Sequence, residues 1–208
     1  MDLELSTGSL CALLGPNGAG KSTTLGMLTG SISPTSGRIH LLGLELFSHL
    51  PALKSRMGVV PESLGLFDHL TVEEHLHLSG PLYGLSLGET RDRAESLLQA
   101  LDLLEARHRF ASQCSHGMRK KTALALALLH DPDLLFLDEP FEGLDPAFSK
   151  ALQGLLRALC QRGRTIFFTS HSLALVEPIA TRTLLLHEGR LIERDPASMS
   201  VEAHYFAH

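Results

Sequence analysis

The chain has 208 residues, of which 44% are hydrophobic, and its formal net charge is −5. This length suits one well-packed domain rather than two, and the negative charge gives no reason to expect nucleic acid as a partner. No apolar run approaches the ~20 residues that a membrane-spanning helix needs. The three cysteines show no paired spacing, so we expect free thiols and a cytoplasmic protein.

The N-terminal part of the chain has short apolar runs that are separated by glycine-rich turns. Residues 10–14 are predicted to form a strand, and a helix is predicted to begin near Lys21 and to end at Gly30. Further strands are expected at 38–42 and 57–60. Strands that alternate with helices are typical of an α/β fold with a largely parallel sheet.

The middle of the chain carries helix signals and no strand signal. Thr71 with Glu74, and Ser86 with Glu89, have the spacing of capping boxes, in which each side chain satisfies a backbone N–H of the other residue. The first of these helices is expected to end near residue 78. A third helix is predicted from the apolar residues at 122–129. These signals predict a helical insertion in the α/β core.

Strand signals resume after the predicted insertion. Residues 134–137 form a continuous apolar run, which is typical of a strand buried on both faces. Asp145-Pro146 is a strong helix start, with Asp as the N-cap and Pro at the first helical position, and Gly163 ends that helix. A further buried strand is predicted at 165–169. The turn at Glu188-Gly189 is expected to join the last two strand segments.

The segment after the first strand carries a phosphate-binding pattern. Residues 15–22, Gly-Pro-Asn-Gly-Ala-Gly-Lys-Ser, fit GxxxxGK[ST] between a strand and a helix, the context that this pattern requires. The glycines let successive N–H groups point at phosphate oxygens, and the helix N-terminus adds the positive end of its dipole. Lys21 can reach the β- and γ-phosphates, and Ser22 can place its hydroxyl on Mg²⁺. The expected nucleotide-binding residues here are Gly15, Pro16, Asn17, Gly18, Ala19, Gly20, Lys21, Ser22 and Thr23.

Two carboxylates follow the apolar run at 134–137. Asp138 and Glu139 would lie at the carboxyl end of that strand, where open α/β sheets bind ligands. Asp138 is suited to holding Mg²⁺ through water, and Glu139 to polarising an attacking water as general base. Together with the phosphate-binding pattern, this pair predicts hydrolysis of a nucleoside triphosphate.

At this point the sequence resembles the nucleotide-binding domain of ABC transporters over nearly the whole chain. The Walker A motif of that family falls on 15–22 and its Walker B motif on 134–138, and Glu139 takes the place of the catalytic glutamate. Gly143 to Asp145 matches the D-loop, where Asp145 would contact the opposite protomer. His171 matches the histidine that senses the γ-phosphate, whereas the residues alone favour a structural histidine there. The catalytic residues that the resemblance implies are Glu139, His171 and Lys21.

The signature motif of the family, commonly Leu-Ser-Gly-Gly-Gln, falls on the segment 114–118, Cys-Ser-His-Gly-Met. Ser115 and Gly117 are kept, and a serine hydroxyl at a helix N-terminus with a nearby glycine can bind a γ-phosphate. Ser-x-Gly-Met followed by basic residues is similar to the ATPases of ABC-2-class exporters. The basic residues 119–121 lie either near a triphosphate or on a solvated face, and the sequence leaves both open.

Two features depart from the pattern of the family. Glu62 replaces the glutamine of the Q-loop, and its carboxylate can still bind Mg²⁺. The expected metal ligands are Ser22, Asp138 and Glu62. Residues 1–9 contain no aromatic ring to stack on adenine, so the chain is expected to be short at its N-terminus and to bind ATP about tenfold more weakly.

The resemblance implies a P-loop NTPase fold. This fold has a RecA-like, three-layer α/β core with a mainly parallel sheet, a small antiparallel N-terminal portion and an inserted α-helical subdomain. The chain, 1–208, is expected to be a single ABC ATPase domain. Its catalytic core would comprise 1–62 and 130–208, and the helical subdomain with the signature motif would comprise 63–129.

The resemblance also implies an ATP-hydrolysing transporter subunit with ATP and Mg²⁺ as cofactors. It would form a head-to-tail homodimer and drive export through a separate permease at the cytoplasmic face of the cell membrane. Two alternatives stay open. One is a nucleotide-binding module with weak or no hydrolysis, which Glu62 and the altered signature motif suggest. The other is an ABC ATPase outside transport, which the negative charge and the lack of tandem ATPase domains oppose.

Overall fold

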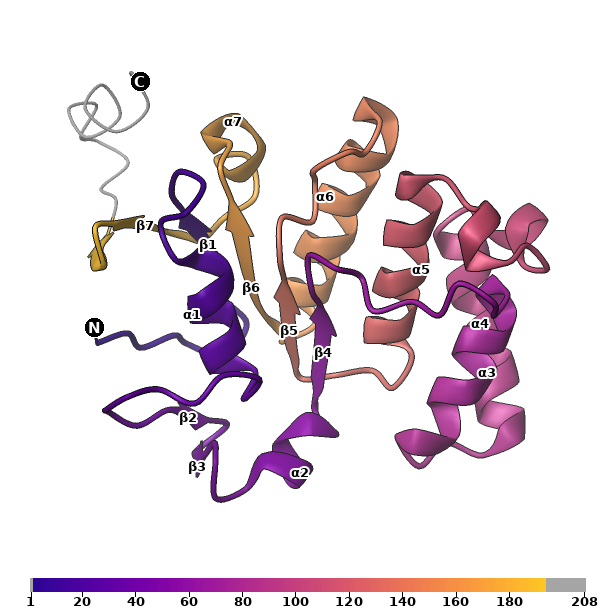
Figure 1. Ribbon diagram of the computed structural model, residues 1–208, viewed down its shortest axis with the longest axis horizontal. Coiled ribbons are helices and arrows are strands. Elements are labelled where there is room, and N and C mark those ends of the chain that lie inside the picture. Colours follow the sequence, from indigo (N-terminus) through magenta and orange to yellow (C-terminus); the bar gives the residue numbers. More distant parts are fainter. Residues whose placement is uncertain (1, 194–208) are drawn as a thin grey trace.

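The computed structural model describes residues 2–193, which form a sheet with helices on both faces (Figure 1). The strands are β1 (Leu10–Leu14), β2 (His40–Leu41), β3 (Leu44–Glu45), β4 (Met57–Val60), β5 (Leu134–Leu137), β6 (Thr165–Ser170), β7 (Arg182–His187) and β8 (Arg190–Glu193). The α-helices are α1 (Lys21–Leu28), α2 (Leu50–Lys54), α3 (Val72–Leu82), α4 (Leu87–Ala100), α5 (His116–Leu128), α6 (Pro146–Gln161) and α7 (Leu173–Val176). Two 3₁₀ helices span Leu104–Ala106 and Ala111–Gln113.

The main sheet has six strands in the order β4-β5-β6-β1-β7-β8. The pairs from β4 to β7 are all parallel, and β8 runs antiparallel to β7. The predicted α/β core with a mainly parallel sheet is therefore confirmed. The strands β1, β4 and β5 have the bounds predicted from the sequence.

The sheet is buried on both faces, and β1 shows how. Leu10, Ala12 and Leu14 enter the hydrophobic cluster that includes α5 and α6. Cys11 and Leu13 point to the other face and enter the cluster that includes α1 and α2. Because successive side chains of a strand point to opposite faces, an unbroken apolar run gives the middle layer of a three-layer core.

A second, two-stranded sheet pairs β2 with β3 antiparallel, so the expected small antiparallel portion is also present. The strand predicted at 38–42 was too long, because only His40–Leu41 pair. Leu42 and Gly43 have φ values of 53° and 80° and turn the chain back. Positive φ at both central residues is the geometry of a tight hairpin turn.

Helices α3, α4 and α5 pack together at the end of the molecule beyond β4 (Figure 1). Both predicted capping boxes are present, at the starts of α3 and α4. The third helix contains most of the predicted apolar stretch 122–129 and begins at His116, because the Oγ atom of Ser115 accepts a hydrogen bond from Met118 N and caps the chain there. The sequence prediction also ended α3 too early, since it continues to Leu82.

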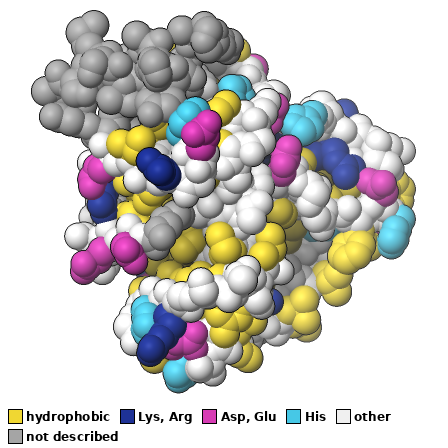
Figure 2. Space-filling view, turned by 60° about the vertical axis from the view of Figure 1, so that its left-hand side comes forward, with side chains coloured by type: hydrophobic (Ala, Val, Ile, Leu, Met, Phe, Trp, Pro, Cys, Tyr) yellow, Lys and Arg dark blue, Asp and Glu magenta, His cyan; other side chains and the backbone are white. Residues whose placement is uncertain are grey.

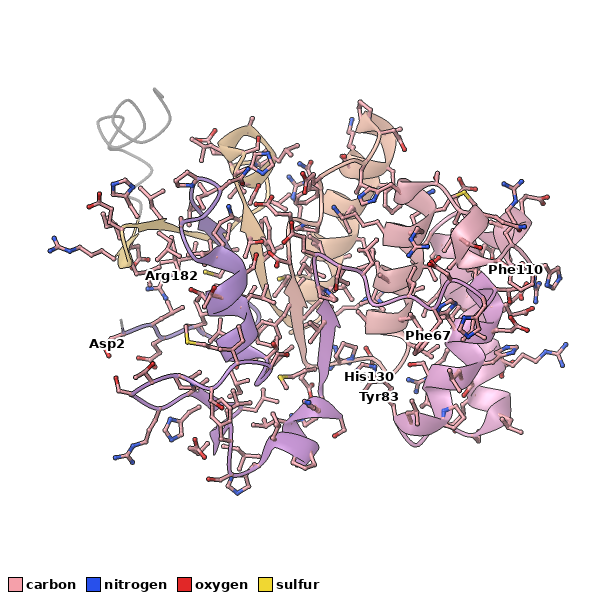
Figure 3. The ribbon with its side chains drawn as sticks, viewed as in Figure 1. Asp2, Phe67, Tyr83, Phe110, His130 and Arg182 are labelled. Carbon is pink, nitrogen blue, oxygen red and sulfur yellow. The ribbon has the colours of Figure 1, made fainter. Side chains whose placement is uncertain are left out.

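Two contacts fix these helices against the core. A Cβ atom at Gly58 of β4 would lie 2.2 Å from the carbonyl oxygen of Ala127, so α5 approaches β4 to a distance that only glycine allows. The ring of Tyr83 stacks on His130 with centroids 3.7 Å apart, and His130 Nε2 lies 3.0 Å from the carbonyl oxygen of Met57 (Figure 3). Both contacts depend on residues far apart in the chain.

One face of the described part carries mixed charge. On the face shown in Figure 2, the described acidic and basic side chains are interspersed and form no single basic patch. None of the helices within residues 2–193 combines the length and the hydropathy needed to cross a bilayer.

Candidate functional site

The segments with predicted chemical roles leave adjacent strands at one edge of the sheet. The loop 15–22 follows β1, Asp138 and Glu139 follow β5, and His171 follows β6. β6 lies between β5 and β1, and all three strands are parallel. Their carboxyl ends therefore meet at one edge, the usual place for a ligand in an α/β sheet.

The loop after β1 is built around Lys21, which begins α1 and is only 6% exposed. Its Nζ atom donates to the carbonyl oxygens of Gly15 at 2.8 Å and Pro16 at 3.3 Å. Gly18 and Gly20 have φ values of 83° and 100°, which residues with side chains rarely adopt. Gly20 caps α1 without a side-chain hydrogen bond, so the first N–H groups of the helix point into the loop uncapped. The loop thus has the backbone geometry for binding phosphate.

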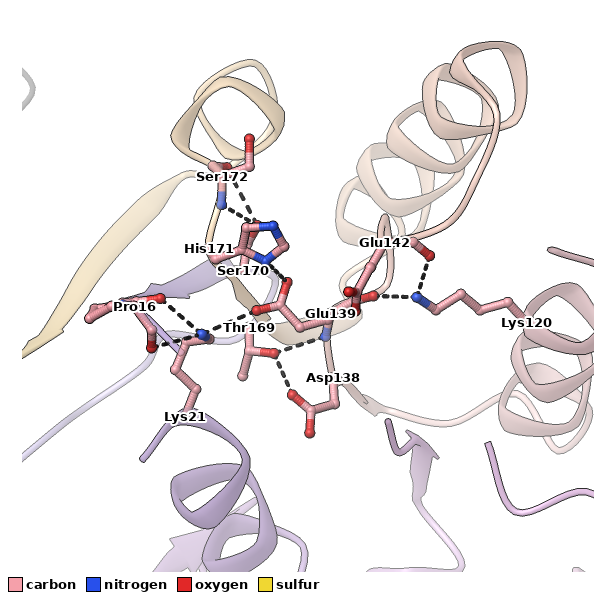
Figure 4. Close-up of polar contacts among 11 residues, drawn as sticks. Pro16, Lys21, Lys120, Asp138, Glu139, Glu142, Thr169, Ser170, His171 and Ser172 are labelled. Atoms are coloured by element: carbon pink, nitrogen blue, oxygen red, sulfur yellow. Dashed lines mark hydrogen bonds and ion pairs between the residues drawn. The ribbon is translucent and has the colours of Figure 1, made fainter. Parts of the chain in front are cut away.

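The Glu139 carboxylate joins this loop to the end of β6 (Figure 4). Its Oε1 atom lies 3.2 Å from Lys21 Nζ, and its Oε2 atom accepts a hydrogen bond from His171 Nδ1 at 3.0 Å. The Glu139 side chain is 12% exposed. Oε1 is buried and has no hydrogen bond besides its ionic contact. The three residues expected to be catalytic are adjacent in space, and this carboxylate has an oxygen able to accept a further hydrogen bond.

Thr169 holds both acids in place, a role that the sequence analysis missed. This residue of β6 is fully buried. Its Oγ1 atom donates to Asp138 Oδ1 at 2.6 Å and accepts from the backbone N–H of Glu139 at 2.9 Å (Figure 4). The only local signal was a hydroxyl within a buried apolar strand, two positions before His171.

The expected metal ligands lie around the same edge. Asp138 is 4% exposed, whereas Ser22 and Glu62 are exposed. Nowhere in residues 2–193 do three or more His, Cys, Asp or Glu side chains form a ready metal site. Mg²⁺ is commonly held by one or two carboxylates, water and substrate phosphates, so the oxygens of Ser22 and Asp138 fit this ion with a triphosphate. Glu62 follows β4, the neighbour of β5.

Three other predicted nucleotide-binding residues lie apart from this cluster. Ser115 caps α5 and Asp145 caps α6, where its Oδ1 atom accepts from the backbone N–H of Phe148 at 2.9 Å. Gly117 lies in the first turn of α5. Among the described contacts, none joins Ser115, Gly117 or Asp145 to Lys21. Within one chain, the predicted nucleotide-binding residues thus form two separate groups.

The basic residues after Ser115 have three different environments. Arg119 donates to Asp68 Oδ1 at 2.7 Å, and Lys121 Nζ lies 3.5 Å from Asp102 Oδ2. Lys120 does not lie on a solvated face, so that alternative is wrong for it. It is buried and donates to backbone carbonyls. Burial lowers the pKa of Lys120, against the opposing charges of the nearby carboxylates Glu142, Glu139, Asp138 and Glu62.

The chain is similar to known proteins along most of its length. A family model described as "ABC transporter" matches residues 1–142. The bacitracin transport ATP-binding protein BcrA of Bacillus licheniformis is 34% identical over 94% of this chain, and the Nod factor export ATP-binding protein I of Cupriavidus metallidurans is 38% identical over 92%. The chain spans 63% of the length of each of these relatives. The dimeric structure of MJ0796, a bacterial ABC transporter cassette, is 25% identical with a TM-score of 0.85, covering 93% of this chain and 89% of that one.

Proposed function

The chain belongs to the ABC transporter family of ATP-binding proteins, and from this membership we propose that it hydrolyses ATP to drive export through a separate permease. The observation that carries the proposal is the Glu139 carboxylate, which bridges Lys21 Nζ at 3.2 Å and His171 Nδ1 at 3.0 Å. A general base, a cation and an imidazole thus lie together beside a phosphate-binding loop.

Binding of ATP is assigned to the loop 15–23. Its backbone N–H groups and the start of α1 receive the phosphate oxygens. Lys21 now donates to the carbonyl oxygens of Gly15 and Pro16 and contacts Glu139. A phosphate oxygen can replace Glu139 as the ionic partner of Lys21, and this frees Oε1 for water. Mg²⁺, for which Ser22 and Asp138 supply oxygens, neutralises charge on the phosphates when it is bound.

Hydrolysis is assigned to Glu139 as general base. Its Oε1 atom accepts a proton from the attacking water as the water oxygen bonds to the γ-phosphorus, and the bond from that phosphorus to the bridging oxygen of ADP breaks. His171 holds Oε2 and so sets the orientation of the carboxylate. Thr169 holds the backbone N–H of the same residue. Each contact places the base before the reaction starts.

We assign Ser115, Gly117 and Asp145 to the nucleotide-binding site of a second copy of the chain. They lie at the starts of α5 and α6, apart from the Lys21 cluster of their own chain. In a head-to-tail homodimer, Ser115 and Gly117 of each copy face the γ-phosphate bound by the other. The dimeric structure of a related cassette supports the formation of a dimer by this chain.

The permease and the location are proposed from the relatives. The two curated relatives are named as a transport and an export ATP-binding protein. We infer that this chain likewise works at the cytoplasmic face of a membrane, where its helical subdomain, residues 63–129, contacts the permease. The α/β core is assigned to 1–62 and 130–208, of which residue 1 and residues 194–208 lie outside the described part.

ATP turnover tests the proposal most directly. Wild-type protein should release phosphate only with both ATP and Mg²⁺ present. Glu139→Gln should lower this rate about 10²- to 10⁴-fold, the usual contribution of a general base, and should keep ATP binding, since the phosphates contact other residues. With ATP, this variant should also accumulate as a dimer in light scattering.

Glu105→Gln is the matched control, because Glu105 is exposed in the 3₁₀ helix Leu104–Ala106. This variant should hydrolyse ATP at the wild-type rate. Equal, near-zero rates for the wild type and for Glu139→Gln would instead identify a nucleotide-binding module without hydrolysis. A dimer that never forms with ATP would contradict the assignment of Ser115 and Gly117.

A further inference from the structure

Lys120 is a buried lysine whose ammonium group donates hydrogen bonds to the backbone. It lies in α5 and is 6% exposed. Its Nζ atom donates to the carbonyl oxygens of Glu139 and Glu142, at 2.6 Å each (Figure 4). A buried ammonium group is costly unless its N–H donors find acceptors, and here two donors hold one short segment of another part of the chain.

That segment is the turn that carries the proposed general base. The backbone N–H of Glu142 donates to the carbonyl oxygen of Glu139 at 3.2 Å, which closes the turn. Glu139 itself has a φ of 44°, a left-handed conformation that is uncommon for residues other than glycine. Such a backbone persists only where its surroundings hold it. Thr169 holds the N–H of Glu139, and Lys120 holds its carbonyl oxygen.

A second contact joins α5 to the end of the same segment. A Cβ atom built on Gly143, which has a φ of 69°, would lie 2.7 Å from Cδ2 of His116. The His116 ring therefore packs directly on the backbone of Gly143. Because His116 and Lys120 are four positions apart, they lie on one face of α5. The helix thus touches the segment 139–143 at two points, one turn apart.

We propose that Lys120 is a positioning residue that sets the backbone of Glu139 and so couples the placement of α5 to ATP hydrolysis. The inference rests on the proposed function, in which Glu139 is the base. Ser115 starts the same helix and faces the partner's nucleotide in the proposed dimer. A shift of α5 at that interface would reach Glu139 through Lys120 without any direct contact between the two nucleotides.

The test is Lys120→Met, which keeps most of the length of the side chain and removes its donors. A base displaced by about 1 Å can lose as much as about 10²-fold in rate, so kcat should fall about 10- to 100-fold. The dissociation constant for ATP with Mg²⁺ should stay within about threefold, since Lys120 does not touch the loop 15–23. Lys54→Met, at an exposed lysine of α2, is the matched control and should leave both values unchanged.

A double variant separates positioning from a general structural role. If Lys120 acts through Glu139, adding Lys120→Met to Glu139→Gln should lower the residual rate by less than about twofold. The proposal would be overturned if the rate losses of the two single variants multiply in the double variant. It would also be overturned if the kcat of Lys120→Met equals that of Lys54→Met. A wild type without ATPase activity would overturn the proposed function as well. Failure of the proposed function is therefore distinguishable from failure of the positioning role alone, in which the wild type is active.

Lys120→Gln covers the case in which Lys120→Met does not fold. Its shorter amide group keeps N–H donors, and a smaller loss of kcat, about three- to tenfold, is expected with the same non-additivity toward Glu139→Gln. Folding is checked by ATP binding and by cooperative unfolding. If neither variant folds, Lys120 is needed only for the stability of the fold, and the positioning role is wrong.

Discussion

The Oε1 atom of Glu139 lies 3.2 Å from the Nζ atom of Lys21, and both side chains are nearly buried. The two residues come from different strand ends, so this ion pair joins the glycine-rich loop to the end of β5. Breaking such a pair from one side is costly, because the remaining charge stays buried without its partner. Removing either partner alone is therefore expected to destabilise the fold as well as to disturb the proposed chemistry.

Replacing Lys21 alone should be more harmful than replacing both partners. Lys21→Met leaves the Glu139 carboxylate without its cation, and we expect the free energy of unfolding to fall by about 3 kcal/mol. Lys21→Met combined with Glu139→Gln removes the orphaned charge and should recover at least about 1 kcal/mol of that loss. Urea unfolding of the wild type and of these two variants measures this difference. A double variant less stable than Lys21→Met would contradict the buried pair.

The hydroxyl of Thr169 should matter more than its methyl group. Thr169→Val leaves Asp138 Oδ1 and the backbone N–H of Glu139 without their buried partner, which should cost about 1–3 kcal/mol of stability and lower the rate of hydrolysis. Thr169→Ser keeps both hydrogen bonds and should cost only about 1 kcal/mol for the lost methyl group. Thermal unfolding and ATP turnover distinguish the two variants. Equal stabilities and equal rates of hydrolysis in Thr169→Val and Thr169→Ser would contradict a role for the hydroxyl.

Gly58 should not tolerate a side chain. In Gly58→Ala, the new Cβ would meet the backbone oxygen of Ala127 at 2.2 Å, so β4 and α5 must move apart. We expect a loss of about 1–3 kcal/mol from overpacking. Gly154→Ala is the control, because Gly154 is exposed within α6 with open space around it, and it should gain about 0.5–1 kcal/mol. In denaturant unfolding, Gly58→Ala should have a lower free energy of unfolding than the wild type, and Gly154→Ala should have a higher one.

His130 should make the protein less stable in mild acid. Burial lowers the pKa of His130 below its ordinary value, and its Nδ1 atom is buried without a hydrogen-bond partner. At pH values between the folded and the unfolded pKa of His130, the unfolded chain binds one proton more than the folded chain. The stability that comes from burying neutral His130 is therefore fully present above the ordinary pKa of about 6.5 and is lost as the pH falls below it. Unfolding at about pH 7.5 and about pH 5.5 measures this loss.

His130→Phe is the matched variant for this pH dependence. Phenylalanine keeps an aromatic ring to stack on Tyr83 but does not titrate. Its overall stability is expected to be lower, since the carbonyl oxygen of Met57 loses its hydrogen bond. The decline between the two pH values should be smaller than in the wild type. An equal decline would show that other groups cause it.

Much of the fold followed from short stretches of sequence. The strands at 10–14, 57–60 and 134–137 were predicted with their observed bounds, because apolar runs bounded by turn residues depend on few neighbours. The capping boxes and the Asp145 cap join residues three positions apart, and these were found too. The strand at 38–42 was overextended because a positive φ at Leu42 cannot be read from its identity.

By itself, the sequence determined the phosphate-binding loop, the two acids after β5 and the family, since each rests on residues adjacent in the chain. The tertiary structure alone decided how these groups are held. Lys120 lies 19 positions from Glu139, and Thr169 lies 31 positions from Asp138, yet each pair is joined by a hydrogen bond. The physical reason is that a buried polar group must find a partner, and only the packing of β5, β6 and α5 determines which partner is near.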